Sequence, residues 1–221
     1  GIVPYDINVP FWSDHAIKSR WFSIPDVGDD VVFDRDATWG APPGTVWIKH
    51  FDLETNRGNA ATRIPIETRF IVRTTNSAYG ITYRWTNGND AVLVPAEGLD
   101  QAFNIVEAGT NRVQVWRYPG RNECRACHTE QVGFSLSFNT RQMNKAWSEG
   151  GSASNQIAVL QGAGYFTSAV SNINALPAFV AATDATHSLE SRVRSYLAVN
   201  CVSCHQPGAA SQGAFDVRPT V

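Results

Sequence analysis

The chain has 221 residues, 43% of them apolar, and a formal net charge of -2 at pH 7. This length allows one large or two modest globular domains, and the slight negative charge argues against a nucleic-acid partner, which calls for a basic surface. The sequence contains no run of about 18 apolar residues, so it predicts no membrane-spanning helix.

Residues 1 to about 118 show the alternation of side chains that is typical of β-strands. Within 45–53, for example, Val46, Ile48 and His50 share one face of the expected strand. The other expected strands lie at 63–74, 79–85, 91–94 and 112–118. Together they predict an antiparallel sandwich or a curled sheet.

All four cysteines of the chain fall in two copies of the pattern C-x-x-C-H. This is the pattern of covalent c-type haem attachment, in which two thiols bond to the porphyrin edge and the following imidazole binds the iron. The sequence thus predicts two haem c groups. The anchors would be Cys124, Cys127, Cys201 and Cys204, and the proximal ligands would be His128 and His205.

Three other readings of the cysteines remain open. Two C-x-x-C knuckles can share one zinc ion, two pairs can form disulfides, and a single pair can be a thioredoxin-like redox site. None of these calls for a histidine directly after each pair, whereas haem attachment does. We therefore favour two haems over these alternatives.

Helical spacing replaces strand alternation after about residue 119. Short helices are expected at 140–148 and 155–161, followed by an amphipathic helix that runs directly into the second haem motif. The apolar face of that helix is expected to carry Leu189, Val193, Tyr196 and Leu197. The predicted fold class is α+β, with an antiparallel β-rich, sandwich-like domain over 1–118 and a mainly helical dihaem cytochrome c domain over 119–221.

Several stretches resemble a family of exported bacterial dihaem c-type cytochromes, some of which are joined to or encoded beside sugar dehydrogenases. The stretches that carry the resemblance are Tyr5 to Asp14, Gly44 to Lys49, Ile66 to Arg69, Arg121 to Cys124 and Ser195 to Cys201. The resemblance covers nearly the whole chain. It implies a β-rich front half and a helical haem half, and it names no electron donor or acceptor.

The two ends of the chain add two expectations. Members of the family continue past the second motif through a loop with a methionine, whereas this sequence stops 16 residues after His205, so the second module is expected to be truncated. The chain starts at Gly1 without a leader. Because covalent haem attachment occurs outside the cytoplasm, we expect a mature protein of the periplasm or the cell exterior whose export signal has been removed.

Each haem iron needs a second axial ligand if it is to be six-coordinate. The chain offers Met143, His15, His50 and His187. Met143 follows His128 closely enough to fold back over the first haem, although a lone methionine is often core filler. His15 and His50 are further candidate ligands, with a hydrogen-bonded loop or core histidine as the alternative, and His187 is expected to be a surface residue.

The basic residues are mainly arginine, fifteen against three lysines. Guanidinium groups pair well with carboxylates such as those of haem, but ordinary surface and cross-strand pairing is the expected role for most of them.

The sequence predicts a protein that transfers single electrons outside the cytoplasm, with a redox partner protein or a neighbouring cytochrome subunit. An electron carrier ranks first among the functions that these motifs allow. A subunit of an extracellular filament or larger complex, with a haem ligand supplied by another chain, ranks second. A peroxidase-like dihaem oxidoreductase with one open iron ranks third.

Overall fold

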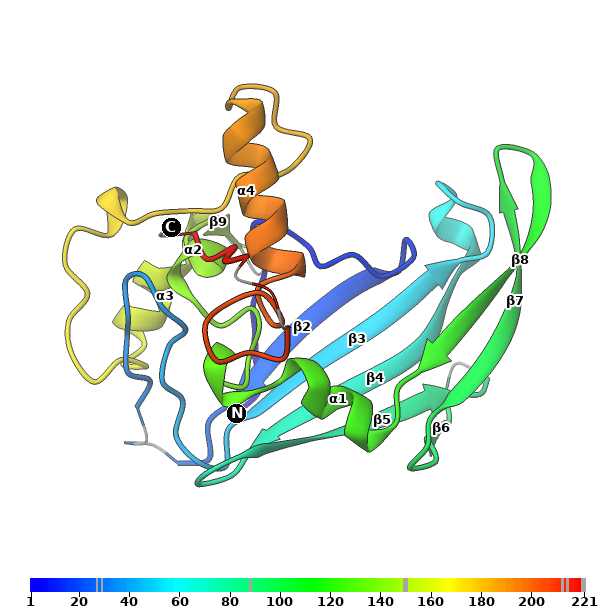
Figure 1. The fold of residues 1–221 in the computed structure, drawn as a ribbon, viewed down its shortest axis with the longest axis horizontal. Coiled ribbons are helices and arrows are strands. Elements are labelled where there is room, and N and C mark those ends of the chain that lie inside the picture. Colours follow the sequence, from blue (N-terminus) through cyan, green and yellow to red (C-terminus); the bar gives the residue numbers. More distant parts are fainter. Residues whose placement is uncertain are drawn as a thin grey trace.

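The computed structural model describes residues 1–26, 28, 30–87, 89–148, 151–211, 213 and 215–219. Its main element is a six-stranded sheet in which every neighbouring pair is antiparallel and the strands follow one another in chain order (Figure 1). The strands are β1 (Val3–Pro4), β2 (Ile17–Ser23), β3 (Val46–Glu54), β4 (Arg63–Arg73), β5 (Ala78–Trp85) and β6 (Ala91–Leu93).

The alternation predicted for β3 is present. Trp47, Phe51 and Leu53 are almost fully buried on its inner face, whereas His50 lies on the other face and is half-buried. Because successive side chains of a strand point to opposite faces, the period of two in the sequence is sufficient to place these residues.

A second sheet consists of the long hairpin β7 (Leu99–Glu107) and β8 (Thr110–Tyr118), which projects from one end of the main sheet (Figure 1). The hairpin is tied to the loop after β3, where the Arg57 amide donates to the Val106 carbonyl at 2.9 Å. Ile105, Trp116 and Tyr118 of the hairpin pack with Phe51 in a small apolar cluster. This cluster closes the end of the sheet that lies away from the helices.

The prediction of a mainly helical second half is wrong. After residue 118, the residues that the structure describes form helices of 7, 4, 7 and 12 residues, two short paired strands and much irregular backbone. The helices are α1 (Arg121–Cys127), α2 (Thr140–Met143), α3 (Gln156–Gly162) and α4 (Leu189–Asn200), the strands are β9 (Ala146–Trp147) and β10 (Ser154–Asn155), and 3-10 turns occur at Ala60–Thr62, Glu130–Val132 and Ile173–Ala175. The protein is therefore mainly β-structure.

Long-range hydrogen bonds explain why this part of the chain is not helical. The Asn8 amide donates to the Gln142 carbonyl at 3.0 Å, and the Trp39 amide donates to the Phe138 carbonyl at 2.9 Å. These backbone groups are satisfied by distant segments instead of by the next helical turn, so the apolar side chains beside them can be buried without a helix. The expected helix at 140–148 ends at Met143 for this reason, and β9 follows.

The largest apolar cluster lies between the sheet and the irregular segments. It joins Tyr5, Phe22 and Trp47 to Phe138 and Met143, all of them almost fully buried. Phe138 meets three of these aromatic rings edge to face, with centroids 5.0 to 6.2 Å apart. Residues on both sides of the predicted domain boundary at 118/119 thus contribute to one core.

Helix α4 is oriented differently from its predicted amphipathic face. Leu189, Val193 and Tyr196 are 66%, 45% and 41% exposed, whereas Ala198 and Val199 are buried. The small residues allow the helix to approach the rest of the chain closely, and the large residues remain in solvent. In the described part of the chain, no helix has the length and apolar character required to cross a membrane.

Candidate functional site

Helix α1 carries the first C-x-x-C-H motif and packs on strand β5. Gly80 of β5 makes this contact close, because a Cβ atom added there would lie 2.5 Å from both Cβ and Sγ of Cys124. Only a residue without a side chain therefore leaves room for the buried thiol. Glu123 begins the helix by accepting a hydrogen bond from the Gly120 amide at 2.7 Å.

Both motifs adopt the same local conformation. In the first, the His128 amide donates to the Cys124 carbonyl at 3.0 Å, and in the second the His205 amide donates to the Cys201 carbonyl at 2.9 Å. Each motif is thus closed as one helical turn, which places its two cysteines three residues apart on one side. All four cysteines are free thiols.

The imidazole of His128 is held in a defined orientation. Its Nδ1 donates to the carbonyl of Phe134 at 2.7 Å, and Phe134 presents that carbonyl from a left-handed backbone conformation with a φ of 65°. Burial lowers the pKa of His128 to about 4, against the opposing effect of this hydrogen bond, so the ring is neutral at neutral pH. In the neutral ring the proton is on Nδ1, and Nε2 keeps its lone pair.

A cavity of about 270 Å³ opens beside the first motif. Cys124, Cys127 and His128 all line it. Its apolar walls come from the N-terminal segment, from the inner face of the sheet and from the segment after α1, through Tyr5, Phe11, Trp47, Ile71 and Leu136. Its charged lining consists of Lys49, Arg69 and Glu123.

The second motif lies at the end of α4, where Cys201 is the C-cap residue. Phe215 packs edge to face against the His205 ring, with centroids 5.7 Å apart, and the Val217 amide donates to the His205 carbonyl at 3.1 Å. Nδ1 of His205 is buried and makes no hydrogen bond to any described residue. The second imidazole therefore lacks the carbonyl partner that orients the first.

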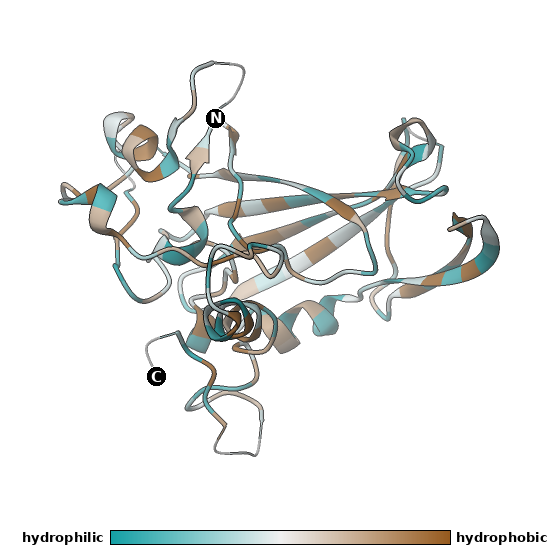
Figure 2. Ribbon diagram, turned by 90° about the horizontal axis from the view of Figure 1, so that it is seen from above, coloured by the Kyte–Doolittle hydropathy of each residue, from teal (hydrophilic) through white to brown (hydrophobic). Residues whose placement is uncertain are grey.

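The two motifs are neighbours in space. In Figure 1 the loop that follows α4 lies next to α1, and Figure 2 shows the same region from above. The segments that follow the motifs meet, since a Cβ atom on Gly208 would lie 3.7 Å from Cγ of Gln131. The N-terminal loop also joins them: Trp12 lines the first cavity, and its amide donates to Oδ1 of Asn200 at 2.9 Å, one residue before Cys201.

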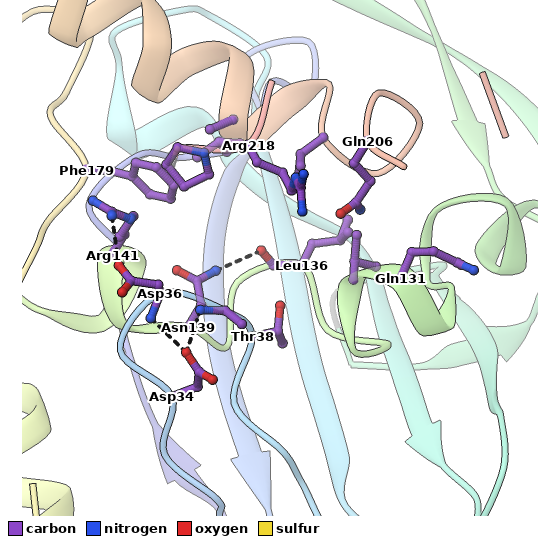
Figure 3. A pocket seen from close by; sticks show the side chains of 16 residues that line it. Asp34, Asp36, Thr38, Gln131, Leu136, Asn139, Arg141, Phe179, Gln206 and Arg218 are labelled. Atoms are coloured by element: carbon purple, nitrogen blue, oxygen red, sulfur yellow. Dashed lines mark hydrogen bonds and ion pairs between the residues drawn. The ribbon is translucent and has the colours of Figure 1, made fainter. Parts of the chain in front are cut away.

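A second cavity, of about 450 Å³, lies between α4 and the segments around Asp36 and Asn139 (Figure 3). Arg141 pairs with Asp36 across one wall at 3.0 Å. Val202 and Gln206 contribute to the opposite wall, but none of Cys201, Cys204 and His205 lines this cavity. It lies beside the second motif without containing its thiols or imidazole.

Two of the predicted distal ligands already have partners. Met143 is fully buried in the core, and its Sδ accepts a hydrogen bond from Nε2 of Gln156 at 3.3 Å. His50 bonds Thr68 through Nδ1 at 2.8 Å and Asp52 through Nε2 at 3.2 Å. Neither side chain lines the cavity of His128, and ligation by either stays a prediction.

The other two histidines lie at the surface. His15 sits in the exposed loop before β2 with a φ of 65°, and its ring packs edge to face against Trp12 at 5.0 Å. Trp12 in turn donates its amide to Asn200 near the end of α4. His187 is exposed and pairs with Asp184 at 3.1 Å.

The residues around the first motif fit a covalently attached haem. Two free thiols on one helical turn, a neutral imidazole with an uncommitted Nε2 and apolar walls are the groups that such a porphyrin requires. Among the described residues, no group of three or more His, Cys, Asp and Glu side chains could hold a metal ion, so the four thiols are not gathered into one zinc site.

Sequence reasoning missed several residues that build this site. Gly80 interrupts an otherwise bulky strand, which is a signal of close backbone approach that could have been used. No comparable sequence pattern predicts that the Phe134 carbonyl accepts from His128. Likewise, none predicts that Lys49 lies beside Arg69. Their roles depend on backbone conformation and strand register, which are set by the fold.

Comparison of the chain with protein-family models, with curated proteins and with solved structures finds no match.

Proposed function

We propose that this protein is a dihaem c-type cytochrome that transfers single electrons. The observation that carries the proposal is His128: a half-buried imidazole, neutral at neutral pH, in the cavity that Cys124 and Cys127 line, oriented through Nδ1 by a backbone carbonyl. This is the arrangement of a histidine that serves as an iron ligand through Nε2. The resemblance to exported dihaem cytochromes supports the same function.

The chain's residues would perform three tasks. Cys124, Cys127, Cys201 and Cys204 would tether two porphyrins, and His128 and His205 would bind their irons. The haems, when bound, supply the one-electron redox chemistry. Trp47 and Ile71 line the first cavity with apolar surface, which would tune the reduction potential of a haem bound there. The segments around Gln131 and Gly208, which follow the two motifs, lie next to each other, and transfer between two haems would require such proximity.

The same proposal includes the compartment and the partners. Covalent haem attachment takes place outside the cytoplasm, so we place the protein in the periplasm or at the cell exterior. Its partner would be a redox protein or a neighbouring cytochrome subunit. The exposed face of α4 with Leu189, Val193 and Tyr196, which leads to the second motif, is the apolar surface best placed for such a contact.

A second candidate function is favoured by one observation. None of His15, His50 and Met143 lines the cavity that contains His128. An iron bound there without a second protein ligand would be open to a small molecule, as in a peroxidase-like oxidoreductase. A high-spin ferric spectrum and rapid cyanide binding would favour this function, whereas two low-spin irons would favour the carrier.

The experiment that tests the proposal is the mass of the denatured protein after expression with a cytochrome c maturation system. We expect the polypeptide mass plus two haems, one haem after Cys124→Ala with Cys127→Ala, and one after Cys201→Ala with Cys204→Ala. His128→Ala should retain covalent haem at the first motif but change its absorption spectrum. A colourless protein with the mass of the bare polypeptide would refute the proposal.

A further inference from the structure

Three cationic side chains lie in one row across the inner face of the main sheet. Arg20 on β2 is directly opposite Lys49 on β3, and Lys49 is directly opposite Arg69 on β4. Like charges at directly opposed positions of an antiparallel sheet are destabilising. Burial, followed by repulsion from Arg20 and Arg69, lowers the pKa of Lys49 well below its usual value, and an anion beside the row would offset that repulsion.

The protein itself provides little negative charge for this row. Glu67 is fully buried and accepts two hydrogen bonds from Arg69 through Oε1, one of them at 3.0 Å. The negative charge of Asp6 raises the pKa of Arg20, but the Asp6 carboxylate is paired with Lys145. One carboxylate is thus committed to the row, and it is already engaged by one of the three cations.

Arg20 and Lys49 have hydrogen-bond donors without acceptors among the described residues. Arg20 is 5% exposed, and its Nε and Nη2 are buried and make no hydrogen bond to any described residue. The Nζ of Lys49 lies over the rings of Phe11 and Phe51, 5.0 Å from each centroid, with no hydrogen bond within the described ranges. Buried cationic groups without acceptors are costly unless a ligand supplies one.

The position of the row identifies the anion. Lys49 and Arg69 line the same cavity as Cys124, Cys127 and His128. A group tethered to these thiols would therefore enter the cavity that both cations line.

We propose that Lys49 and Arg69 form the binding site for the carboxylates of the group attached at Cys124 and Cys127, with Arg20 reinforcing their positive potential. The inference rests on the proposed function, since haem brings two carboxylates into the cavity. Charge-assisted hydrogen bonds from ammonium and guanidinium groups are the strong kind, and they gain strength in a partly buried site. The carboxylates would offset the repulsion within the row.

The test uses the full chain with Cys201→Ala and Cys204→Ala, so that only the first motif carries haem. The haem is labelled with carbon-13 at its carboxylates by growth on labelled aminolevulinic acid, and the carboxylate stretch is recorded by infrared spectroscopy. Lys49→Met and Arg69→Gln remove one cation each, and Lys49→Arg retains the charge. Arg112→Gln is the matched control, because Arg112 pairs with Glu107 on the distant hairpin.

We expect a labelled band at the frequency of an ion-paired carboxylate in the parent, in Lys49→Arg and in Arg112→Gln. In Lys49→Met and Arg69→Gln the band should move to the frequency of a hydrated carboxylate. The same spectrum in all five proteins, with haem attached by mass, would overturn the carboxylate site and leave the cytochrome intact. Absence of covalent haem from the parent would overturn the proposed function itself, and the two failures are therefore distinguishable.

Discussion

The Cβ and Sγ atoms of Cys124 occupy the space beside Gly80, 2.5 Å from where a Cβ atom on that glycine would lie. The first haem motif is thus positioned by the absence of a side chain on β5. Helix α1 can pack closely on the sheet because residue 80 of β5 has no side chain.

Gly80→Ala should displace α1 and lower both stability and haem attachment at the first motif. The added methyl group overlaps a buried thiol, and overpacking of this kind costs about 1–3 kcal/mol. Mass spectrometry should show a fraction of molecules with one haem, and thermal unfolding should occur at a lower temperature. Gly162→Ala is the control, since nothing lies within 4 Å of an added Cβ there. Equal behaviour of the two variants would show that α1 tolerates the clash.

Met143→Leu should change stability without changing the spectra of either iron. The thioether is fully buried and accepts a hydrogen bond from Gln156, so a swap of similar volume should cost about 1 kcal/mol. The measurement is chemical unfolding together with the near-infrared band of ferric iron that reports thioether ligation. Loss of such a band in the variant would instead identify Met143 as an axial ligand.

Lys18 should give the protein a rising stability at alkaline pH. Burial, followed by repulsion from Arg20 and Arg69, lowers the pKa of Lys18 from 10.5 to about 8, against the opposite effect of Asp14. Between these two values the unfolded chain binds more protons than the folded one, so stability increases with pH across that window. After a discount for partial exposure, the contribution is about 1–2 kcal/mol.

Urea unfolding at several pH values tests this contribution. The increase in the free energy of unfolding from pH 8 to pH 10.5 should be smaller in Lys18→Met than in the parent by about 1–2 kcal/mol. Lys18→Arg should also lose it, because arginine does not deprotonate in this range. Identical pH profiles in the parent and both variants would contradict the assigned role.

Asn200→Leu should loosen the loop that joins the two motifs. Oδ1 of Asn200 accepts the Trp12 amide at 2.9 Å, and a hydrogen bond of this kind contributes about 1 kcal/mol. We expect exchange of the Trp12 amide with deuterium to become about five-fold faster. Asn200→Asp keeps the acceptor and should retain the protection, so equal acceleration in both variants would exclude this bond as its source.

Strands β3, β4, β5, β6 and β8 of the front half follow from the sequence because alternation acts locally, whereas β2 and β7 were not predicted. The period of two in β3 places Trp47 and Phe51 on one face and His50 on the other. It does not show which face is buried, and the expectation of a core position for His50 is not met, because the face of Trp47 and Phe51 is the inner one. The two haem motifs are equally local, since each is one helical turn. Structure that depends on a few neighbouring residues, such as strand alternation and a single helical turn, was predictable.

The errors arise where distant segments decide the outcome. Helix α4 exposes Leu189 and buries Ser195, because the fit against the remaining chain requires small residues there. Residues after Met143 leave the helix because β9 pairs with β10. The row of Arg20, Lys49 and Arg69 depends on register across three strands, and β3 and β4 shift register at Phe51/Asp52. Side-chain periodicity contains no information on these choices.

The burial of Cys124 also constrains the order in which the molecule is assembled. Its side chain is 9% exposed and packs against β5 while α1 is docked, so under the proposed function an attachment enzyme would reach this thiol more readily before α1 docks. Haem attachment would then come before the docking of α1. A chain in which α1 docked first would attach haem poorly at Cys124.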